Sequence, residues 1–216
     1  MDPRPEPPIV TARGEAVREV PPETARFSVT VSAAGKDQAG VLERLTRRAA
    51  EIDALLDEYA TVVERRETSG VQVHPEFRRG GERVTAYTGN VGTTVTVSDF
   101  ARLGELLARL AGQEATAVAG PWWQMRPGSD AGAEVRREAV ADALRRARDY
   151  AAAVGAEIDR LVEITDGELE SVRPMLRAAA FGTAEAGDLA FDLHPAPQTV
   201  SAAVTVRVTI TEPADL

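Results

Sequence analysis

The sequence predicts an α+β fold, with a mixed, mostly antiparallel sheet or sheets and three main helices packed on one side. Three stretches of the chain carry apolar residues at helical spacing. The stretches between them alternate apolar and polar residues, as half-buried strands do. Some strand patterns follow one another directly, as in hairpins, and others follow a helix, as in crossover connections. This mixture indicates the α+β class.

The chain opens with two strand patterns. Residues 1–8 are proline-rich and predict a disordered tail. Ile9–Ala16 is a short expected strand, and Val20–Glu23 is expected to form a turn because it contains two consecutive prolines. Ala25–Ser32 alternates strictly, with apolar residues at the odd positions, and predicts a half-buried strand.

A helix and a hairpin are expected next. Asp37 can cap a helix over Gln38–Tyr59, where apolar residues recur every 3.6 positions and charged residues lie opposite. Strands over Val62–Val73 and Arg83–Val97 enclose a turn rich in glycine and arginine, which predicts a hairpin.

The second helix is expected over Phe100–Ala111, with Ser98 and Asp99 as its cap. A strand follows over Ala117–Met125. Its Gly120-Pro121 dipeptide indicates an edge strand or a bulge, because proline cannot donate a hydrogen bond to a neighbouring strand.

The longest helix is expected over Ala131–Val154, with Gly155 as its C-terminal cap residue. The alanines on its inward row predict a close approach to whatever the helix covers. Strands are expected over Glu157–Thr165 and Val200–Ile210. Both long helices are followed directly by a strand, which hints at a duplicated helix–strand unit. The inward row comprises Val135, Ala139, Ala143, Ala147, Tyr150, Ala151 and Val154.

The segment Asp166–Thr199 is a long loop rich in alanine, glycine and proline. Loops of this length are uncommon in compact domains and are usually functional or disordered. The expected organisation is one domain over residues 9–211, or two intertwined subdomains, with this loop at 166–199 and a tail at 212–216.

Composition narrows the classes of function. The net charge of −9 repels phosphate backbones and anionic lipids, so neither nucleic acid nor a membrane surface is an expected partner. The chain has no cysteine, which excludes disulfides, thiolate nucleophiles and cysteine-ligated metals. No cofactor is expected. The start of the sequence lacks the apolar core of a signal peptide, which predicts a cytoplasmic protein.

Four stretches, in this order and spacing, resemble the SIMPL domain family, a bacterial and eukaryotic group of largely uncharacterised function. They are Ile9–Gly14 with Pro21–Ala25, Tyr87–Asn90 followed by Val95–Asp99 and Leu103-Gly104, Ala117–Trp122, and Arg137–Ala143 with Arg146-Ala147, Tyr150-Ala151 and Gly155. Glu23 stands where members usually have aspartate.

The resemblance implies an α+β fold, self-association, and loose links to stress tolerance and to scaffolding in signalling. Many members carry a leader and act in the bacterial envelope, and the present sequence departs from them in this respect. The family offers no established catalytic residues to carry over.

The candidate chemical groups favour structural roles. His74 and His194 each precede a proline, and no acidic pattern nearby forms a ligand cluster with either, so two unrelated surface histidines are expected rather than a metal or acid–base pair. The turn over Arg78–Gly81 lacks a following helix N-terminus and is expected to be a solvated tip, not an anion site. The carboxylates of Glu138 and Asp142 are interleaved with arginines, which is typical of a solvated salt-bridge face.

Four aromatic residues remain as ligand or interface candidates. Trp122 and Trp123 are adjacent on an expected strand, so their rings face opposite sides, one in the core and one free for a ligand or a subunit. Phe181 and Phe191 make the 166–199 loop too apolar for a pure linker. It either packs on a neighbouring subunit or a groove, or is an insertion with few contacts.

The sequence therefore predicts a non-enzymatic, self-associating protein, a homo-oligomer that acts as an interaction or scaffold module, with protein partners. The alternative is a small-molecule binding protein with a pocket near Trp122 and Trp123. A second alternative is an enzyme of unrecognised type, for which no motif is present.

Overall fold

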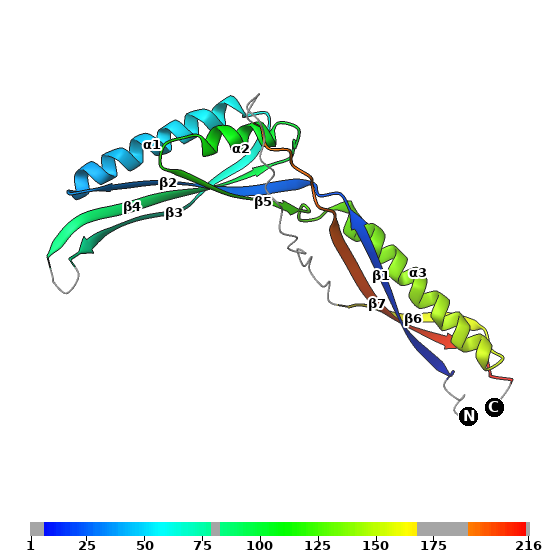
Figure 1. Cartoon of the computed structure of the whole chain (residues 1–216). Coiled ribbons are helices and arrows are strands. Elements are labelled where there is room, and N and C mark those ends of the chain that lie inside the picture. The colour runs from blue at the N-terminus through cyan, green and yellow to red at the C-terminus, as the bar shows by residue number, and fades with distance from the viewer. Residues whose placement is uncertain (1–6, 79–82, 168–189, 215–216) are drawn as a thin grey trace. The chain divides into compact units, whose positions relative to one another are not determined.

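Figure 1 shows the computed structural model of the chain, which describes residues 7–78, 83–167 and 190–214. The chain divides into two compact units, each with its own antiparallel sheet and its own apolar core. The described residues form three helices and seven strands. The predicted α+β class is confirmed, and every described strand pair is antiparallel.

Unit 1 is a three-stranded sheet with one helix on one face. Its strands lie in the order β1-β7-β6, and the helix α3 packs mainly on β1 and β7. The helix begins after Ser129, whose hydroxyl accepts a hydrogen bond from the N–H of Ala131. The elements are β1 (Ile9–Val20), α3 (Asp130–Ala153), β6 (Ile158–Asp166) and β7 (Gln198–Ile210).

The alanine row of α3 approaches its neighbour closely, as the sequence predicts, and the structure shows that this neighbour is β1. Ala139, Ala143, Ala147 and Ala151 are buried. Gly14 lies beneath them, and a Cβ atom built there would stand 2.1 Å from the carbonyl oxygen of Ala139. Only a glycine allows this separation between strand and helix.

Unit 2 is a four-stranded sheet in the order β3-β4-β2-β5, with α1 and α2 packed against one face. Its core contains the inward residues of β2, as the alternation predicts. Phe27, Val29 and Val31 pack there against Leu45 and Leu56 of α1. The elements are β2 (Thr24–Gly35), α1 (Gln38–Glu58), β3 (Val63–Phe77), β4 (Val84–Val97), α2 (Leu103–Ala111) and β5 (Thr116–Gln124).

The two units share one topology. In each, a strand leads to a helix and then to two further strands, and the last strand pairs with the first while the middle strand lies outside. Thus β1-α3-β6-β7 corresponds to β2-α1-β3-β4. The hint of a duplicated helix–strand unit is therefore confirmed in the topology. Within the described residues, unit 2 adds α2 and β5, and β5 pairs with the free side of β2.

Some local expectations were wrong. The second helix begins at Leu103 instead of Phe100, because Asp99 accepts a hydrogen bond from the N–H of Ala101 in a turn before the helix. Tyr150 was expected in the inward row of α3 but is 56% exposed. The buried residues of this helix follow one another at intervals of four, from Val135 to Ala151, and Tyr150 does not fall in that series. Thr209, which the alternation of Val200–Ile210 would place on the outward side, is buried, and its hydroxyl donates to Asp159.

Other expectations fall partly on residues that the structure does not describe. They are the tail over residues 1–8, of which only 7 and 8 are described, and the centre of the 166–199 loop.

Within the described ranges, no helix is both long and apolar enough to cross a membrane.

Candidate functional site

The acidic side of α3 covers the outer edge of β1. The backbone N–H of Glu15, which points away from the sheet, donates to Asp142 Oδ2 at 3.1 Å. Arg18 of the same strand pairs with Glu134 at 2.9 Å and with Glu138 at 2.7 Å. An edge whose donor is occupied by a carboxylate is a poor template for another strand.

The hydrogen bond from Glu15 also lowers the pKa of Asp142 below its ordinary value, and the guanidinium groups of Arg145 and Arg146 act in the same direction. Arg146 Nε lies 3.0 Å from the carboxylate. Asp142 is therefore held ionised, as an acceptor and not as a proton donor. A carboxylate so committed is unsuited to general acid chemistry near neutral pH.

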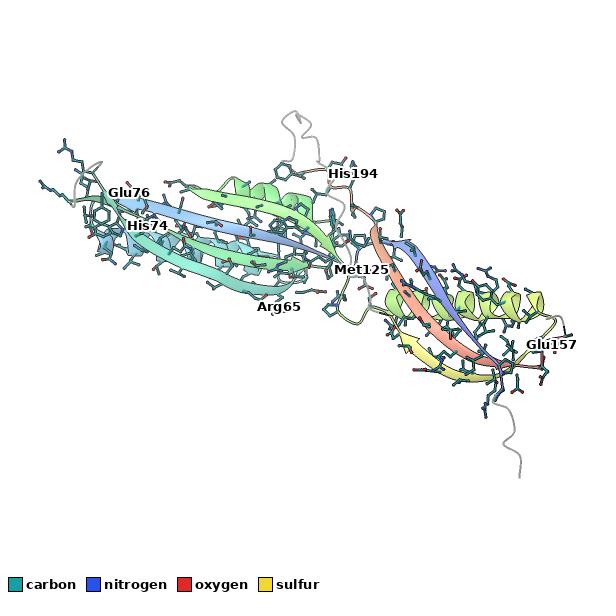
Figure 2. The ribbon with its side chains drawn as sticks, turned by 90° about the horizontal axis from the view of Figure 1, so that it is seen from below. Arg65, His74, Glu76, Met125, Glu157 and His194 are labelled. Carbon is teal, nitrogen blue, oxygen red and sulfur yellow. The ribbon has the colours of Figure 1, made fainter. Side chains whose placement is uncertain are left out.

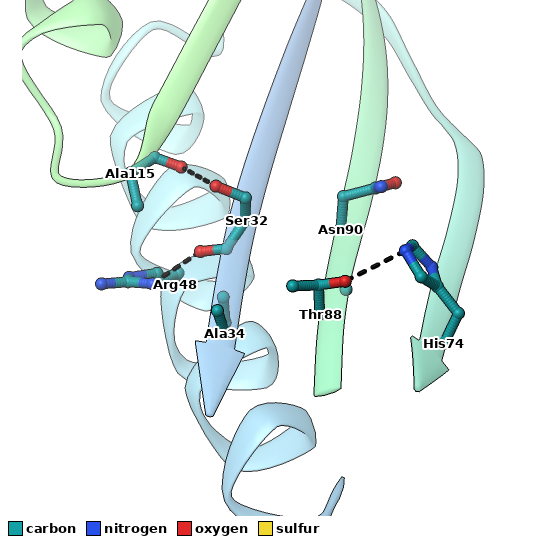
Figure 3. A pocket seen from close by; sticks show the side chains of 9 residues that line it. Ser32, Ala34, Arg48, His74, Thr88, Asn90 and Ala115 are labelled. Atoms are coloured by element: carbon teal, nitrogen blue, oxygen red, sulfur yellow. Dashed lines mark hydrogen bonds between the residues drawn. The ribbon is translucent and has the colours of Figure 1, made fainter. Parts of the chain in front are cut away.

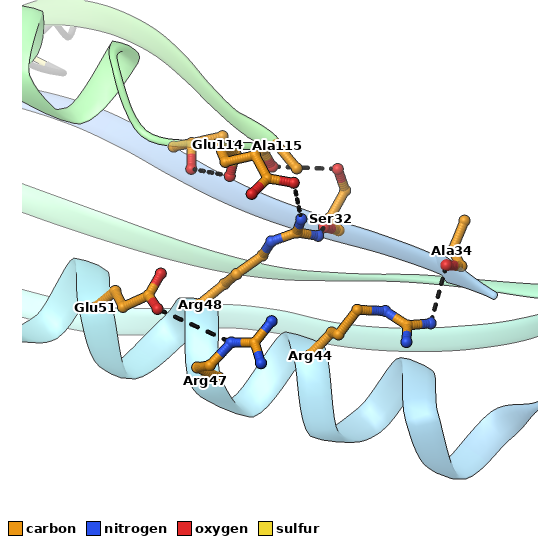
Figure 4. A network of polar contacts seen from close by, with 9 residues as sticks. Ser32, Ala34, Arg44, Arg47, Arg48, Glu51, Glu114 and Ala115 are labelled. Atoms are coloured by element: carbon orange, nitrogen blue, oxygen red, sulfur yellow. Dashed lines mark hydrogen bonds and ion pairs between the residues drawn. The ribbon is translucent and has the colours of Figure 1, made fainter.

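In unit 2 the corresponding helix uses arginines for the same purpose (Figure 4). Strand β5 pairs with β2 as far as Val31, which leaves the carbonyl groups of Ser32 and Ala34 beyond its reach. Arg48 donates to the Ser32 carbonyl at 2.5 Å, and Arg44 donates to the Ala34 carbonyl at 3.0 Å. Arg48 also pairs with Glu114 at 2.5 Å.

The outer strands β3 and β6 are protected differently. Three register shifts interrupt the pairing of β3, and two interrupt that of β6. Both strands also carry charged residues along their length, four of them between Val63 and Ser69 and four between Ile158 and Asp166. Bulges and charges are the usual means of preventing edge-to-edge pairing.

The outer strand β5 carries no charge, but one register shift interrupts its pairing with β2 between Arg26 and Ser28, and Pro121 stands inside the strand. Thr116–Gln124 contains no charged residue, and β5 is alone in this among the outer strands that the structure describes. Trp123 faces the core, where its ring lies 4.9 Å from that of Phe100 in an edge-to-face arrangement. Trp122 faces the opposite side and is 46% exposed. It lies beside the exposed Arg26 of β2.

A cavity of about 420 Å³ lies on unit 2, over the ends of β2, β3 and β4 (Figure 3). His74 Nε2 is 3.0 Å from Thr88 Oγ1, and the Ser32 hydroxyl donates to the Ala115 carbonyl. Strand β4 separates His74 from Ser32, so the two stand roughly 10 Å apart, twice the spacing of neighbouring strands. This arrangement lacks the direct nucleophile–base contact of an activated serine.

An apolar cavity of about 400 Å³ lies between α1 and the hairpin β3–β4. Leu42 and Val71 line it and are 44% and 61% exposed, because α1 packs mostly on β2 and β4 and leaves β3 largely uncovered. Of the described residues that line this cavity, Asp53 alone is charged.

A buried tyrosine joins α1 to α2. Tyr59 is fully buried, and its hydroxyl donates to Glu105 Oε1 at 2.5 Å and accepts from Arg109 at 3.2 Å. Arg109 also pairs with Glu58 at 2.8 Å. The hydrogen bond to Glu58, followed by that to Tyr59, raises the pKa of Arg109 above its ordinary value. The cluster fixes the two helices together and keeps its arginine charged.

Comparison with known proteins identifies the family of the chain. Residues 10–208 match the SIMPL family, described as a protein of unknown function (DUF541). The chain belongs to the SIMPL family. No curated protein matches the sequence. A crystal structure of an unknown protein from Galdieria sulphuraria is 13% identical, with 88% of this chain and 84% of that chain covered and a TM-score of 0.21. The SIMPL resemblance expected from the sequence is thus confirmed.

The candidate histidines of the SIMPL chain lie apart. In Figure 2, His74 lies towards the hairpin end of β3 and His194 towards the other end of unit 2. The side chain of His194 is 86% exposed, with Asp192 at 3.7 Å. Among the described residues, no three acidic or histidine side chains are grouped to hold a metal ion.

The aromatic candidates of the 166–199 loop have different outcomes. Phe181 lies outside the described residues. Phe191 is 47% exposed, and its backbone N–H donates to the carbonyl of Gly104 at 3.3 Å. Leu193 packs against the core of unit 2. The end of the loop therefore packs on its own chain at α2.

The chain exposes one apolar feature that sequence reasoning missed. Leu161, Val162 and Ile164 of β6 are 47%, 45% and 49% exposed, and we call them the β6 apolar surface. They are exposed because α3 packs on β1 and β7 and leaves β6 almost uncovered. Apolar and polar residues do not alternate cleanly in this segment, so its pattern does not indicate which side chains a helix would cover.

Proposed function

We propose that this SIMPL protein is a non-enzymatic interaction module that self-associates. The observation that supports it best is the β6 apolar surface, three large side chains in four residues that are each about half exposed on an outer strand. Full burial of a side chain of this kind contributes roughly 1.5–3 kcal/mol. A second copy of the chain would supply the cover that α3 does not.

We expect the two copies to contact each other through the side chains of the β6 apolar surface, and not by pairing their β6 strands. Leu161 and Ile164 lie opposite Val208 and Val206, whose side chains point to the face that α3 covers. The two register shifts of β6 disturb its backbone edge, which disfavours addition of another strand. The apolar face beside α3 is therefore the expected interface.

The polar groups support a role without catalysis. The carboxylate of Asp142 is engaged by a backbone amide and by arginines, and Ser32 and His74 are directed to different partners. The alternative of a small-molecule site beside the tryptophans has less support, since neither of the two cavities described is lined by Trp122 or Trp123.

The test is the mass of the chain in solution by light scattering. The double variant Leu161→Glu and Ile164→Glu changes only side chains that are already half exposed, so folding is expected to persist. The wild type is expected to give a multiple of 23.1 kDa, and the double variant 23.1 kDa. Val71→Glu, at a 61% exposed apolar residue of unit 2, is the matched control and is expected to leave the oligomer intact. Equal masses for all three chains would reject this interface.

A further inference from the structure

We propose that the cavity over the ends of β2, β3 and β4 binds a short neutral saccharide. The cavity has a volume of about 420 Å³, which is of the size that small-molecule sites have in proteins. It belongs to unit 2 and shares no residue with the β6 apolar surface of unit 1. This proposal and the proposed self-association can therefore fail independently.

The cavity lies on the face of the unit 2 sheet that α1 and α2 leave open. Val31 and Ala33 of β2 belong to the core, so the side chains of Ser32 and Ala34 point to the opposite face. The backbone groups of the strands are paired with one another here. A ligand on this face must therefore be recognised by side chains.

The side chains that line the cavity can both donate and accept hydrogen bonds (Figure 3). Asn90 is partly buried, and its carboxamide makes no hydrogen bond to another described residue. The Ser32 hydroxyl donates to the Ala115 carbonyl at 3.2 Å and keeps its oxygen as an acceptor. Thr88 shares a hydrogen bond with His74 at 3.0 Å, and its oxygen retains a lone pair whichever of the two donates. A sugar hydroxyl also donates and accepts, so it matches this mixture.

The charges around the cavity favour a neutral ligand. Of the described residues that line it, Arg48 alone carries a permanent charge, and the carboxylate of Glu114 lies 2.5 Å from its guanidinium group. Arg48 also donates to the Ser32 carbonyl. The positive charge is thus neutralised within the chain, and no described residue of the lining supplies a carboxylate for a cation.

The arrangement of the lining fits a sugar ring. Ala34 and Ala115 supply apolar surface beside the hydrogen-bonding groups. A pyranose ring has the same two parts, since its C–H faces are apolar and its edge carries hydroxyls. Ser32 lies opposite Asn90 in the register, and Thr88 follows on the same face, which places the Cβ atoms of the three roughly 5–8 Å apart. The hydroxyls of one or two rings can reach all three side chains.

The test titrates the full chain with three neutral trisaccharides, maltotriose, cellotriose and chitotriose, and follows the side-chain amide resonances of Asn90. At least one trisaccharide is expected to shift these resonances at millimolar concentration. Asn90→Ala is expected to weaken its binding roughly tenfold, as measured by calorimetry. Gln72→Ala is the matched control and is expected to bind as the wild type does, because Gln72 lies opposite Asn90 on β3 but does not line the cavity.

Ala34→Leu is a second variant, which places a larger side chain at an exposed position of the cavity wall and is expected to exclude the saccharide without unfolding the chain. The proposal is wrong if none of the three trisaccharides shifts the Asn90 resonances, or if Asn90→Ala and Ala34→Leu both leave the affinity unchanged. Tighter binding of trigalacturonate, an anionic trisaccharide, or of acetyl-trialanine amide, a neutral peptide, than of every neutral trisaccharide would also overturn it.

Discussion

The backbone amide of Glu15 donates to Asp142 at 3.1 Å, and this contact has a counterpart of opposite sign in the other unit, where Arg48 donates to the carbonyl of Ser32. Both helix residues directly precede an inward alanine of their helix, Ala143 and Ala49. The same position on a repeated helix thus guards the outer edge of the strand before it, by an acceptor in one unit and by a donor in the other.

The Asp142 contact predicts a stability that depends on pH. Its pKa is lowered in the folded chain, so its contribution is present above the unfolded value of about 3.9 and is lost as the pH falls through the lower folded value. Asp142→Asn is expected to be less stable than the wild type to urea at neutral pH, with a difference that shrinks in strong acid. Asp149→Asn is the control, because Asp149 is 68% exposed and lies 3.9 Å from Arg145. A difference between wild type and Asp142→Asn that stays constant down to strong acid would contradict this assignment.

Gly14 predicts a packing effect. The Cβ atom of Gly14→Ala would overlap the backbone of α3 at Ala139 and Ala143, and neither backbone can move without displacing the helix. Overpacking of this kind typically costs about 1–3 kcal/mol. Gly70→Ala, where a Cβ meets nothing within 4 Å, is expected to be neutral in the same urea titration. Equal effects of the two substitutions would show that α3 is not held at this distance.

The architecture was largely predictable from the sequence because the core patterns are local. Strict alternation identified β2, and the alanine row of α3 predicted that this helix closely approaches the element it covers. The partners of strands were not predictable, because pairing depends on distant residues. The turn at Pro21 carries the chain from the sheet of unit 1 to that of unit 2, and nothing in its sequence separates this from a hairpin.

In the candidate site, the sequence predicted the direction of a side chain only where the alternation within a single strand determines it. The opposite facing of Trp122 and Trp123 follows from the period of a strand. The β6 apolar surface depends instead on where α3 lies across the sheet, which is a property of helix packing. The edge contacts of Asp142 and Arg48 join elements far apart in the chain, and both residues resemble ordinary charged positions on a solvated helix face.

Tyr59 predicts the effect of one hydroxyl. Tyr59→Phe keeps the buried ring but removes a donor to Glu105 and an acceptor for Arg109. The expected loss in the free energy of unfolding is about 1–3 kcal/mol, measured in urea. Tyr150→Phe removes a hydroxyl that is exposed and makes no hydrogen bond to any described residue, and it is expected to be silent.

Gly104 of α2 allows the end of the 166–199 loop to pack closely on this helix, which can be tested by substitution. A Cβ atom there would lie 2.1 Å from the carbonyl oxygen of Phe191, so Gly104→Ala is expected to release the residues around Phe191 from α2. Hydrogen exchange at the Phe191 amide should become faster, whereas the strands of unit 1 should be unaffected. Gly112→Ala, with contacts no closer than 3.5 Å, is the control. Unchanged protection at Phe191 would show that this contact is not formed in solution.

Sedimentation equilibrium of the purified chain, run over a wide range of concentrations, tests self-association most directly. The mass is expected to exceed 23.1 kDa and to fall to that value when Leu161 and Ile164 are replaced by glutamate. A mass of 23.1 kDa for the wild type at every concentration would contradict the proposal that this SIMPL protein acts through assembly.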